Sequence, residues 1–207
     1  MRKRFDDNRR EELLDGVMRI ISAHGFSKVT ILELAKELHC SGSSLYKIAP
    51  NKDSLVMLAI THWGERTLKN IEAQAIRGKT AADRARLYFL AGAEAISPMS
   101  HEFRSDVNRF ASTRLAYANS SDRFIVRLVE LLDDAVKAGE IRPVNTQFLA
   151  HALRQMAYLI RDEELLSKCG LTASQAIQET QQFIWDGVRV NSINRKTGAH
   201  ARQNVPP

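Results

Sequence analysis

The apolar residues of this chain recur at helical spacing in almost every segment. In residues 9–24, Leu13, Val17, Ile20 and Ile21 form one stripe, and Gly25 follows as a helix stop. The same period recurs in the segments 52–75, 80–97, 100–115, 121–139, 145–160 and 172–190. The polar run 118–121 interrupts the pattern and predicts a break between two helices. With the two short helices described next, we predict an all-α protein of about nine helices.

The segment from Thr30 to Asp53 predicts two short helices and the start of a third. Thr30 and Glu33 form a capping box, which marks the start of the first. Ser41 can cap the second helix, and Asn51 can cap the helix that follows it. Two short helices joined by a tight turn form a helix-turn-helix, whose second helix enters the DNA major groove.

Composition and charge narrow the class of protein. Of the 207 residues 44% are hydrophobic, and only 5 are proline and 10 glycine, which indicates a globular chain with a substantial core. The net charge of +6 favours a polyanionic partner, with nucleic acid first and an anionic membrane surface second. The two cysteines, Cys40 and Cys169, form no disulfide framework. Neither a signal sequence nor a membrane-spanning run is present, so we expect a soluble intracellular protein.

The predicted helices divide into a three-helix head and a six-helix body. We place the DNA-binding head at residues 1–50, the body at 51–190, and a disordered basic tail at 191–207. Residues 1–8 read as a charged arm before the first helix.

An ordered set of residues within this frame matches a known pattern. It comprises Gly25-Phe26, Lys28-Val29-Thr30, Leu34-Ala35, Ser41 with Ser44-Leu45-Tyr46, and Asn51-Lys52-Asp53-Ser54-Leu55. In order, type and spacing this set resembles the TetR-type transcriptional regulators. The chain departs from that pattern at His39, where the family usually has glycine. It departs again at Ile48-Ala49, where a histidine or tyrosine followed by phenylalanine is usual.

The resemblance implies DNA contacts from the second and third helices and the start of the fourth. Tyr46 and Lys52 resemble the family's phosphate-contacting residues, while Ser43, Ser44 and Lys47 would face the groove. The complete set of DNA-binding candidates is Lys28, Thr30, Ser41, Ser43, Ser44, Tyr46, Lys47 and Lys52.

The resemblance also implies a homodimer on a palindromic operator and a small-molecule effector that releases the DNA, as expected of a repressor. The last two helices would pair between protomers, through Phe148, Ala152, Gln155, Phe183 and Gly187. In relatives the effector pocket is lined by the helices that here carry Trp63, Tyr88, Phe103, Phe110 and Met156.

The sequence offers little support for other classes of function. It has no His-Glu-x-x-His, no Walker-type phosphate loop and no glycine-rich dinucleotide turn, so we expect no enzyme. The cysteines and six histidines show no metal-ligand spacing, and no cofactor is indicated. The alternative is an all-helical ligand-binding or interaction protein with little operator-specific DNA binding.

Overall fold

The structure is a computed structural model that describes residues 2–189, with the side chains of residues 7–189. Over this range the chain is all-α, as predicted, and forms no strand beyond one antiparallel bridge between Ile141 and Arg189. Within residues 2–189 no helix is long and apolar enough to cross a membrane. The helices are α1 (Arg2–His24), α2 (Ile31–Glu37), α3 (Gly42–Tyr46), α4 (Lys52–Ala75), α5 (Ala81–Ala95), α6 (His101–Arg109), α7 (Ala111–Lys137), α8 (Thr146–Leu159), α9 (Glu163–Cys169) and α10 (Ala173–Val188).

The chain packs as two compact units. Of the described residues, the first contains 2–74 and 91–126, and the second contains 75–90 and 127–189. The predicted boundary at residue 50 separates a DNA-binding head from the body by function, and it stays a prediction. The predicted tail 191–207 lies outside the described residues.

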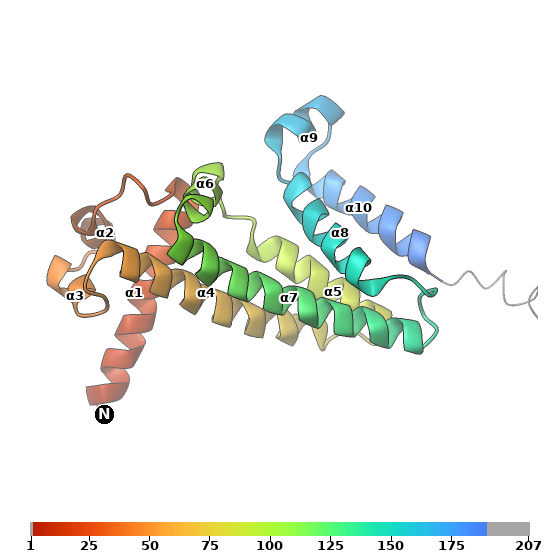
Figure 1. Ribbon diagram of the computed structural model, residues 1–207, viewed down its shortest axis with the longest axis horizontal. Coiled ribbons are helices and arrows are strands. Elements are labelled where there is room, and N and C mark those ends of the chain that lie inside the picture. Colours follow the sequence, from red (N-terminus) through yellow and green to blue (C-terminus); the bar gives the residue numbers. More distant parts are fainter. Residues whose placement is uncertain (1, 190–207) are drawn as a thin grey trace, which may run out of the picture. The chain divides into compact units, whose positions relative to one another are not determined.

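The core of the first unit gathers apolar side chains from α1, α2, α3, α4 and α6. The stripe predicted on α1, Leu13, Val17, Ile20 and Ile21, is fully buried there. In Figure 1, α1 crosses α4, and α6 lies next to the C-terminal end of α1. Asp15 on α1 contacts His62 and Arg66 of α4.

The predicted arm at residues 1–8 is wrong, because α1 already begins at Arg2. The segment contains no proline or glycine, and its arginine, lysine and aspartate residues continue the helix.

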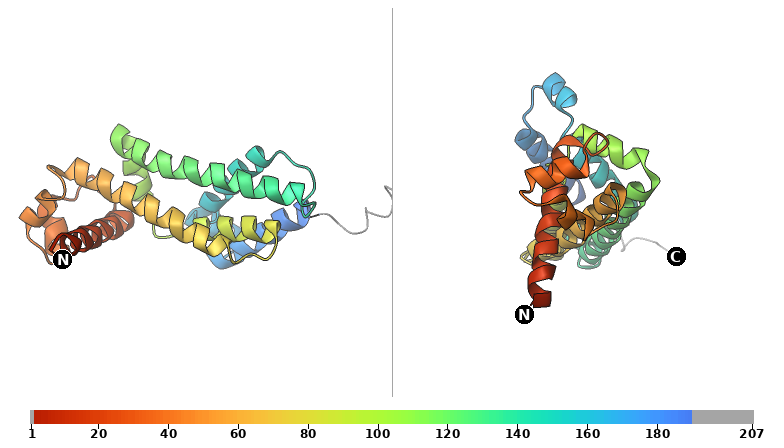
Figure 2. Two further views of the ribbon diagram at one scale, coloured as in Figure 1. Left: turned by 90° about the horizontal axis from the view of Figure 1, so that it is seen from below. Right: turned by 90° about the vertical axis from the view of Figure 1, so that its left-hand side faces the viewer.

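The predicted helix break at residues 118–121 is also wrong, since α7 runs through it without interruption. The chain leaves the helix earlier, at Phe110, which is extended with φ −107° and ψ 127°. The small side chains instead permit close packing against α4: a Cβ at Gly64 would lie 1.9 Å from the Ser120 hydroxyl. Figure 2 shows α4 and α7 running alongside each other. A polar run thus marks a close helix contact here, and not a loop.

In the second unit, α8 and α10 run antiparallel with α9 between them (Figures 1 and 2). α9 makes the described helices ten in number, where we predicted nine. Asp162 caps its start and Gly170, with φ +65°, ends it. Glu140 accepts the Ala82 amide at 2.7 Å, which provides α5 with a capping carboxylate from the α7–α8 connection.

Candidate nucleic-acid interface

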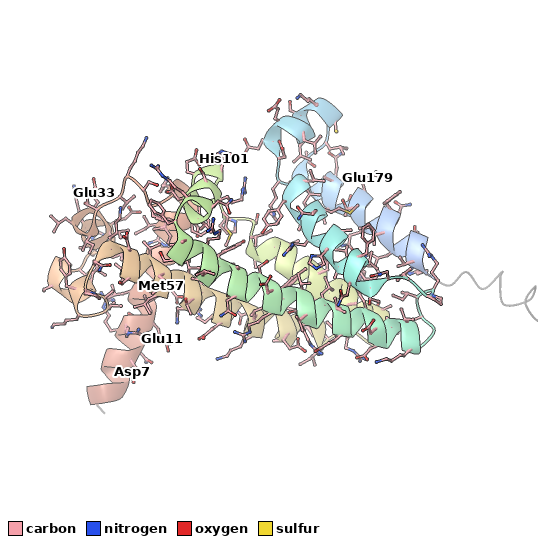
Figure 3. All side chains as sticks on the ribbon, viewed as in Figure 1. Asp7, Glu11, Glu33, Met57, His101 and Glu179 are labelled. Carbon is pink, nitrogen blue, oxygen red and sulfur yellow. The ribbon has the colours of Figure 1, made fainter. Side chains whose placement is uncertain are left out.

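The helix-turn-helix is built by the caps that the sequence predicted. The Thr30 hydroxyl accepts from the Glu33 amide at 3.2 Å, and the Glu33 carboxylate accepts from the Thr30 amide at 2.8 Å. Ser41 accepts from the Ser44 amide at 3.2 Å and starts α3. α2 packs directly on α3, and Glu33 is labelled on α2 in Figure 3. The two short helices therefore owe their ends to local hydrogen bonds and their mutual packing to Leu34 and Leu45, both fully buried.

The turn between α2 and α3 contains the single described non-glycine residue with a positive φ. His39 has φ +49°, in the left-handed region. A glycine adopts this conformation without steric cost, whereas a residue with a Cβ does not. This conformation explains why glycine suits the position where the chain carries histidine.

α3 exposes the side chains predicted to meet DNA. Tyr46 is 53% exposed, and Ser43 and Lys47 are also exposed. The Ser41 hydroxyl lies 2.8 Å from that of Ser43 and 2.9 Å from that of Ser44, so the three hydroxyls form one hydrogen-bonded group.

An open hollow of about 440 Å³ lies where the start of α2, the end of α3 and the start of α4 meet. Thr30, Tyr46 and Lys52 all border it, so the structure brings three of the predicted residues together. Lys28 is exposed nearby in sequence but does not line the hollow. Leu32, 72% exposed, also lines it and was not predicted, because an apolar side chain offers neither a charge nor a hydrogen bond that would indicate a DNA contact.

The loop between α1 and α2 is held by two charged side chains from later in the chain. Lys52 Nζ donates to the carbonyls of Phe26 and Ser27, at 3.0 and 3.2 Å. Asp106 on α6 accepts the amides of the same two residues, at 2.6 and 2.8 Å, and also the Ser27 hydroxyl. Lys52 thus has a structural partner as well as its predicted place near DNA.

Asp106 was not predicted, because nothing near it in sequence distinguishes it from a solvated carboxylate. Partial burial of the carboxyl raises its pKa, but the hydrogen bonds from Ser27 and Phe26 and the charge of Arg109 outweigh this, so the pKa lies below its ordinary value. The ionised form is the one that the loop binds.

Comparisons with known proteins agree with this geometry. Residues 13–57 match the family model for bacterial regulatory proteins of the tetR family. Residues 13–57 therefore form an N-terminal domain of the TetR type. A search of curated proteins finds no match.

Several solved structures of transcriptional regulators share the fold. A protein from Rhodococcus sp., described as a TetR-family transcriptional regulator, is 18% identical with a TM-score of 0.73, over 87% of this chain and 98% of that one. A transcriptional regulator from Saccharomonospora viridis in complex with choline is 18% identical with a TM-score of 0.72, over 89% and 100%. The ketosteroid regulator KstR2 of Mycobacterium tuberculosis is 16% identical with a TM-score of 0.63, over 88% and 96%.

The residues predicted to bind an effector fall in both units of the chain. Trp63, Phe103 and Phe110 belong to the first unit. Trp63 stacks on Tyr117 at 6.1 Å, Tyr117 meets Phe103 at 6.3 Å, and Phe26 meets Phe103 and Phe110 at 6.2 and 5.9 Å. These three predicted residues therefore join one chain of aromatic rings. Tyr88, which is buried, and Met156 belong to the second unit.

The residues predicted at the dimer interface lie on α8 and α10. Phe148 and Phe183 are 75% and 76% exposed within one protomer. Ala152 and Gln155 follow Phe148 on the same face of α8, and Gly187 follows Phe183 by one turn on α10. No atom lies within 4 Å of a Cβ built at Gly187, so nothing in the described protomer requires a glycine there.

Proposed function

We propose that this chain is a transcriptional repressor that binds a palindromic operator as a homodimer and is released by a small-molecule effector. The observation that carries the proposal is the exposure of Ser43 and Tyr46 on α3, and of Lys47 directly after it. α3 is a capped helix that packs on α2. Such an element places one helix in the major groove and leaves its N-terminal side chains at base edges.

The chemistry of each side chain suggests whether it contacts phosphate or a base edge. Tyr46 and Lys52, at the open hollow, contact phosphate together with Lys28 and Thr30, and these contacts fix the position of the head. Lys47 reaches base edges, while the serine hydroxyls read bases weakly because they both donate and accept.

The homodimer is supported by the two exposed phenylalanines. A soluble monomer rarely exposes two large aromatic side chains to this extent on neighbouring helices. Pairing of α8 and α10 with those of a second copy would cover Phe148 and Phe183. Two heads then address half-sites one helical turn of DNA apart, or a multiple of it.

Selection of bound sequences from random duplex DNA, followed by a band-shift titration, tests the DNA-binding part. We expect an enriched palindrome, and we expect Tyr46→Phe and Lys47→Ala to weaken its binding. The slope of log affinity against log salt should fall by about one unit for each lost phosphate contact. Lys79→Ala, an exposed charge outside the head, is the matched control and should bind as the wild type. Wild-type affinity in both head variants would contradict the assignment.

One observation favours the alternative, an all-helical ligand-binding or interaction protein with little operator specificity. The hydroxyls of Ser41, Ser43 and Ser44 bond to one another, which leaves fewer groups to read bases. Under this alternative the selection experiment enriches no sequence.

A further inference from the structure

The inner face of α10 combines an apolar stripe with polar atoms that lack partners. Ile184, Trp185 and Val188 are buried on this face, and Gln181 lies one turn before Trp185. Trp185 is only 4% exposed. Its indole nitrogen and both atoms of the Gln181 amide are inaccessible to solvent, and have no hydrogen-bond partner within residues 2–189.

Buried polar atoms without partners lower the stability of the fold unless another molecule forms hydrogen bonds with them. A buried polar atom without a partner destabilises a fold by about 1–3 kcal/mol, and native proteins satisfy nearly all such atoms. An apolar residue at position 181 would continue the stripe and avoid the cost. Three such atoms within one turn of one helix therefore indicate an occupant with complementary groups.

The chemistry of the three atoms defines that occupant. The Trp185 indole N–H and the Gln181 amide N–H donate, whereas the Gln181 oxygen accepts. A carbonyl oxygen can take both donors, and an adjacent N–H can complete a reciprocal pair with the Gln181 amide. A carboxylate fits less well, since it would bring a negative charge towards the Gln181 oxygen.

The rest of the occupant should be apolar. Within the described part of this unit, every side chain that is fully buried belongs to a hydrophobic residue, Leu153 and Ile160 among them. An uncharged molecule loses little when transferred to such surroundings, and its single polar group supplies orientation.

We propose that Gln181 and Trp185 form the polar part of a binding site for an uncharged, largely apolar small molecule that carries an amide or lactam group. The inference rests on the proposed function in that this molecule would be the effector. The opposite face of α10 carries Phe183 and Gly187, so one helix would serve both the effector and the dimer.

A first experiment needs no ligand. Gln181→Leu removes both amide atoms while keeping a similar volume, so we expect its Tm to equal or exceed that of the wild type. Gln178→Leu, an exposed glutamine on α10, is the matched control and should leave Tm unchanged. A Tm several degrees lower for Gln181→Leu alone would overturn the inference, because it would show that the amide is satisfied within the folded chain.

A second experiment uses Trp185 as a reporter. The chain has two tryptophans, so Trp63→Phe leaves Trp185 as the sole source of indole emission. We expect caprolactam or laurolactam to change this emission in a saturable way. The cyclic ketones of similar ring size, which keep the carbonyl but lose the N–H, should bind about tenfold more weakly, as should either lactam in the added Gln181→Leu background. No response to either lactam, or equal affinity after Gln181→Leu, would overturn the site.

The same lactams added to the band-shift titration separate this inference from the proposed function. If a lactam binds but does not release the DNA, the site on α10 stands, and the hypothesis that this ligand releases the DNA is refuted. If neither lactam changes the Trp185 emission while the chain still binds operator DNA, the lactam site is refuted and the proposed DNA-binding function stands.

Discussion

The carboxylate of Asp106 accepts the backbone amide of Ser27 at 2.8 Å across 79 residues of sequence. The same carboxylate accepts the Phe26 amide, while Lys52 binds the carbonyls of both residues. The loop that enters the helix-turn-helix therefore has its polar groups satisfied by side chains of α4 and α6. The position of α2 therefore depends on α4 and α6, and the sequence of α2 itself gives no sign of this dependence.

Asp106→Asn should lower the free energy of unfolding by about 1–3 kcal/mol at neutral pH, since hydrogen bonds to a charged acceptor are among the stronger ones. Because the pKa of Asp106 is lowered in the folded state, its contribution is present above the ordinary pKa of about 4. It is lost as the pH falls through the lower, folded-state pKa. Urea titrations of both proteins between neutral and acidic pH measure the difference, which should shrink in acid. Asp122→Asn, an exposed carboxylate on α7, should show no such difference.

Gly25→Ala should destabilise the chain more than Gly139→Ala. Both glycines have a positive φ, +73° and +68°, so both substitutions incur about 1–2 kcal/mol of backbone strain. At Gly25 the new Cβ would also lie 2.7 Å from the Asp106 carboxylate, whereas at Gly139 no atom lies within 4 Å. The additional overpacking should cost about 1–3 kcal/mol. Equal losses in chemical denaturation would show that α6 does not approach the loop this closely.

His39→Gly should stabilise the chain by about 0.5–1 kcal/mol. Glycine relieves the left-handed strain at φ +49°, and the gain is partly offset by the greater freedom of glycine in the unfolded chain. Glu37→Gly, within the last turn of α2, is the contrasting variant and should destabilise by about 1 kcal/mol. A lower Tm for His39→Gly would mean that the histidine side chain contributes more than its backbone costs.

Much of the head could be predicted because its determinants are local. Thr30, Ser41 and Asn51 each cap a helix through an amide three residues later, and such spacing is visible in the sequence. Asp106 and Gly64 act through partners far along the chain, and their significance appears only when α6 and α7 are in place. The break predicted at residues 118–121 failed for the same reason, since small polar residues suit a tight helix contact as well as a loop.

Lys52→Met should reduce stability even in the absence of DNA. The substitution keeps the aliphatic stem but removes the donor that satisfies the Phe26 and Ser27 carbonyls, so we expect a loss of about 1–2 kcal/mol. Lys47→Met, at the exposed position directly after α3, should leave Tm unchanged and weaken only DNA binding. Thermal unfolding of the two variants separates the roles, and an unchanged Tm for Lys52→Met would refute the structural one.

Phe183→Glu should convert the proposed dimer to a monomer, and Phe148→Glu should do the same. A charge at the centre of an apolar contact leaves an unpaired buried group, which costs several kcal/mol. Leu115→Glu, on α7, is the matched control because Leu115 is equally exposed, at 71%, but lies outside the proposed interface. Sedimentation equilibrium reports the mass of each variant. A dimer that survives both phenylalanine substitutions would place the interface elsewhere.

The loop fixed by Asp106 also bears on the order in which the chain matures on the ribosome. The segment that carries the family pattern, residues 13–57, is synthesised well before residue 106. Until α6 leaves the exit tunnel, the amides of Phe26 and Ser27 lack their carboxylate, and Phe26 lacks the rings of Phe103 and Phe110. The helix-turn-helix thus reaches its final form only after half of the polypeptide exists, so a nascent chain lacks the fully fixed loop before α2 until then.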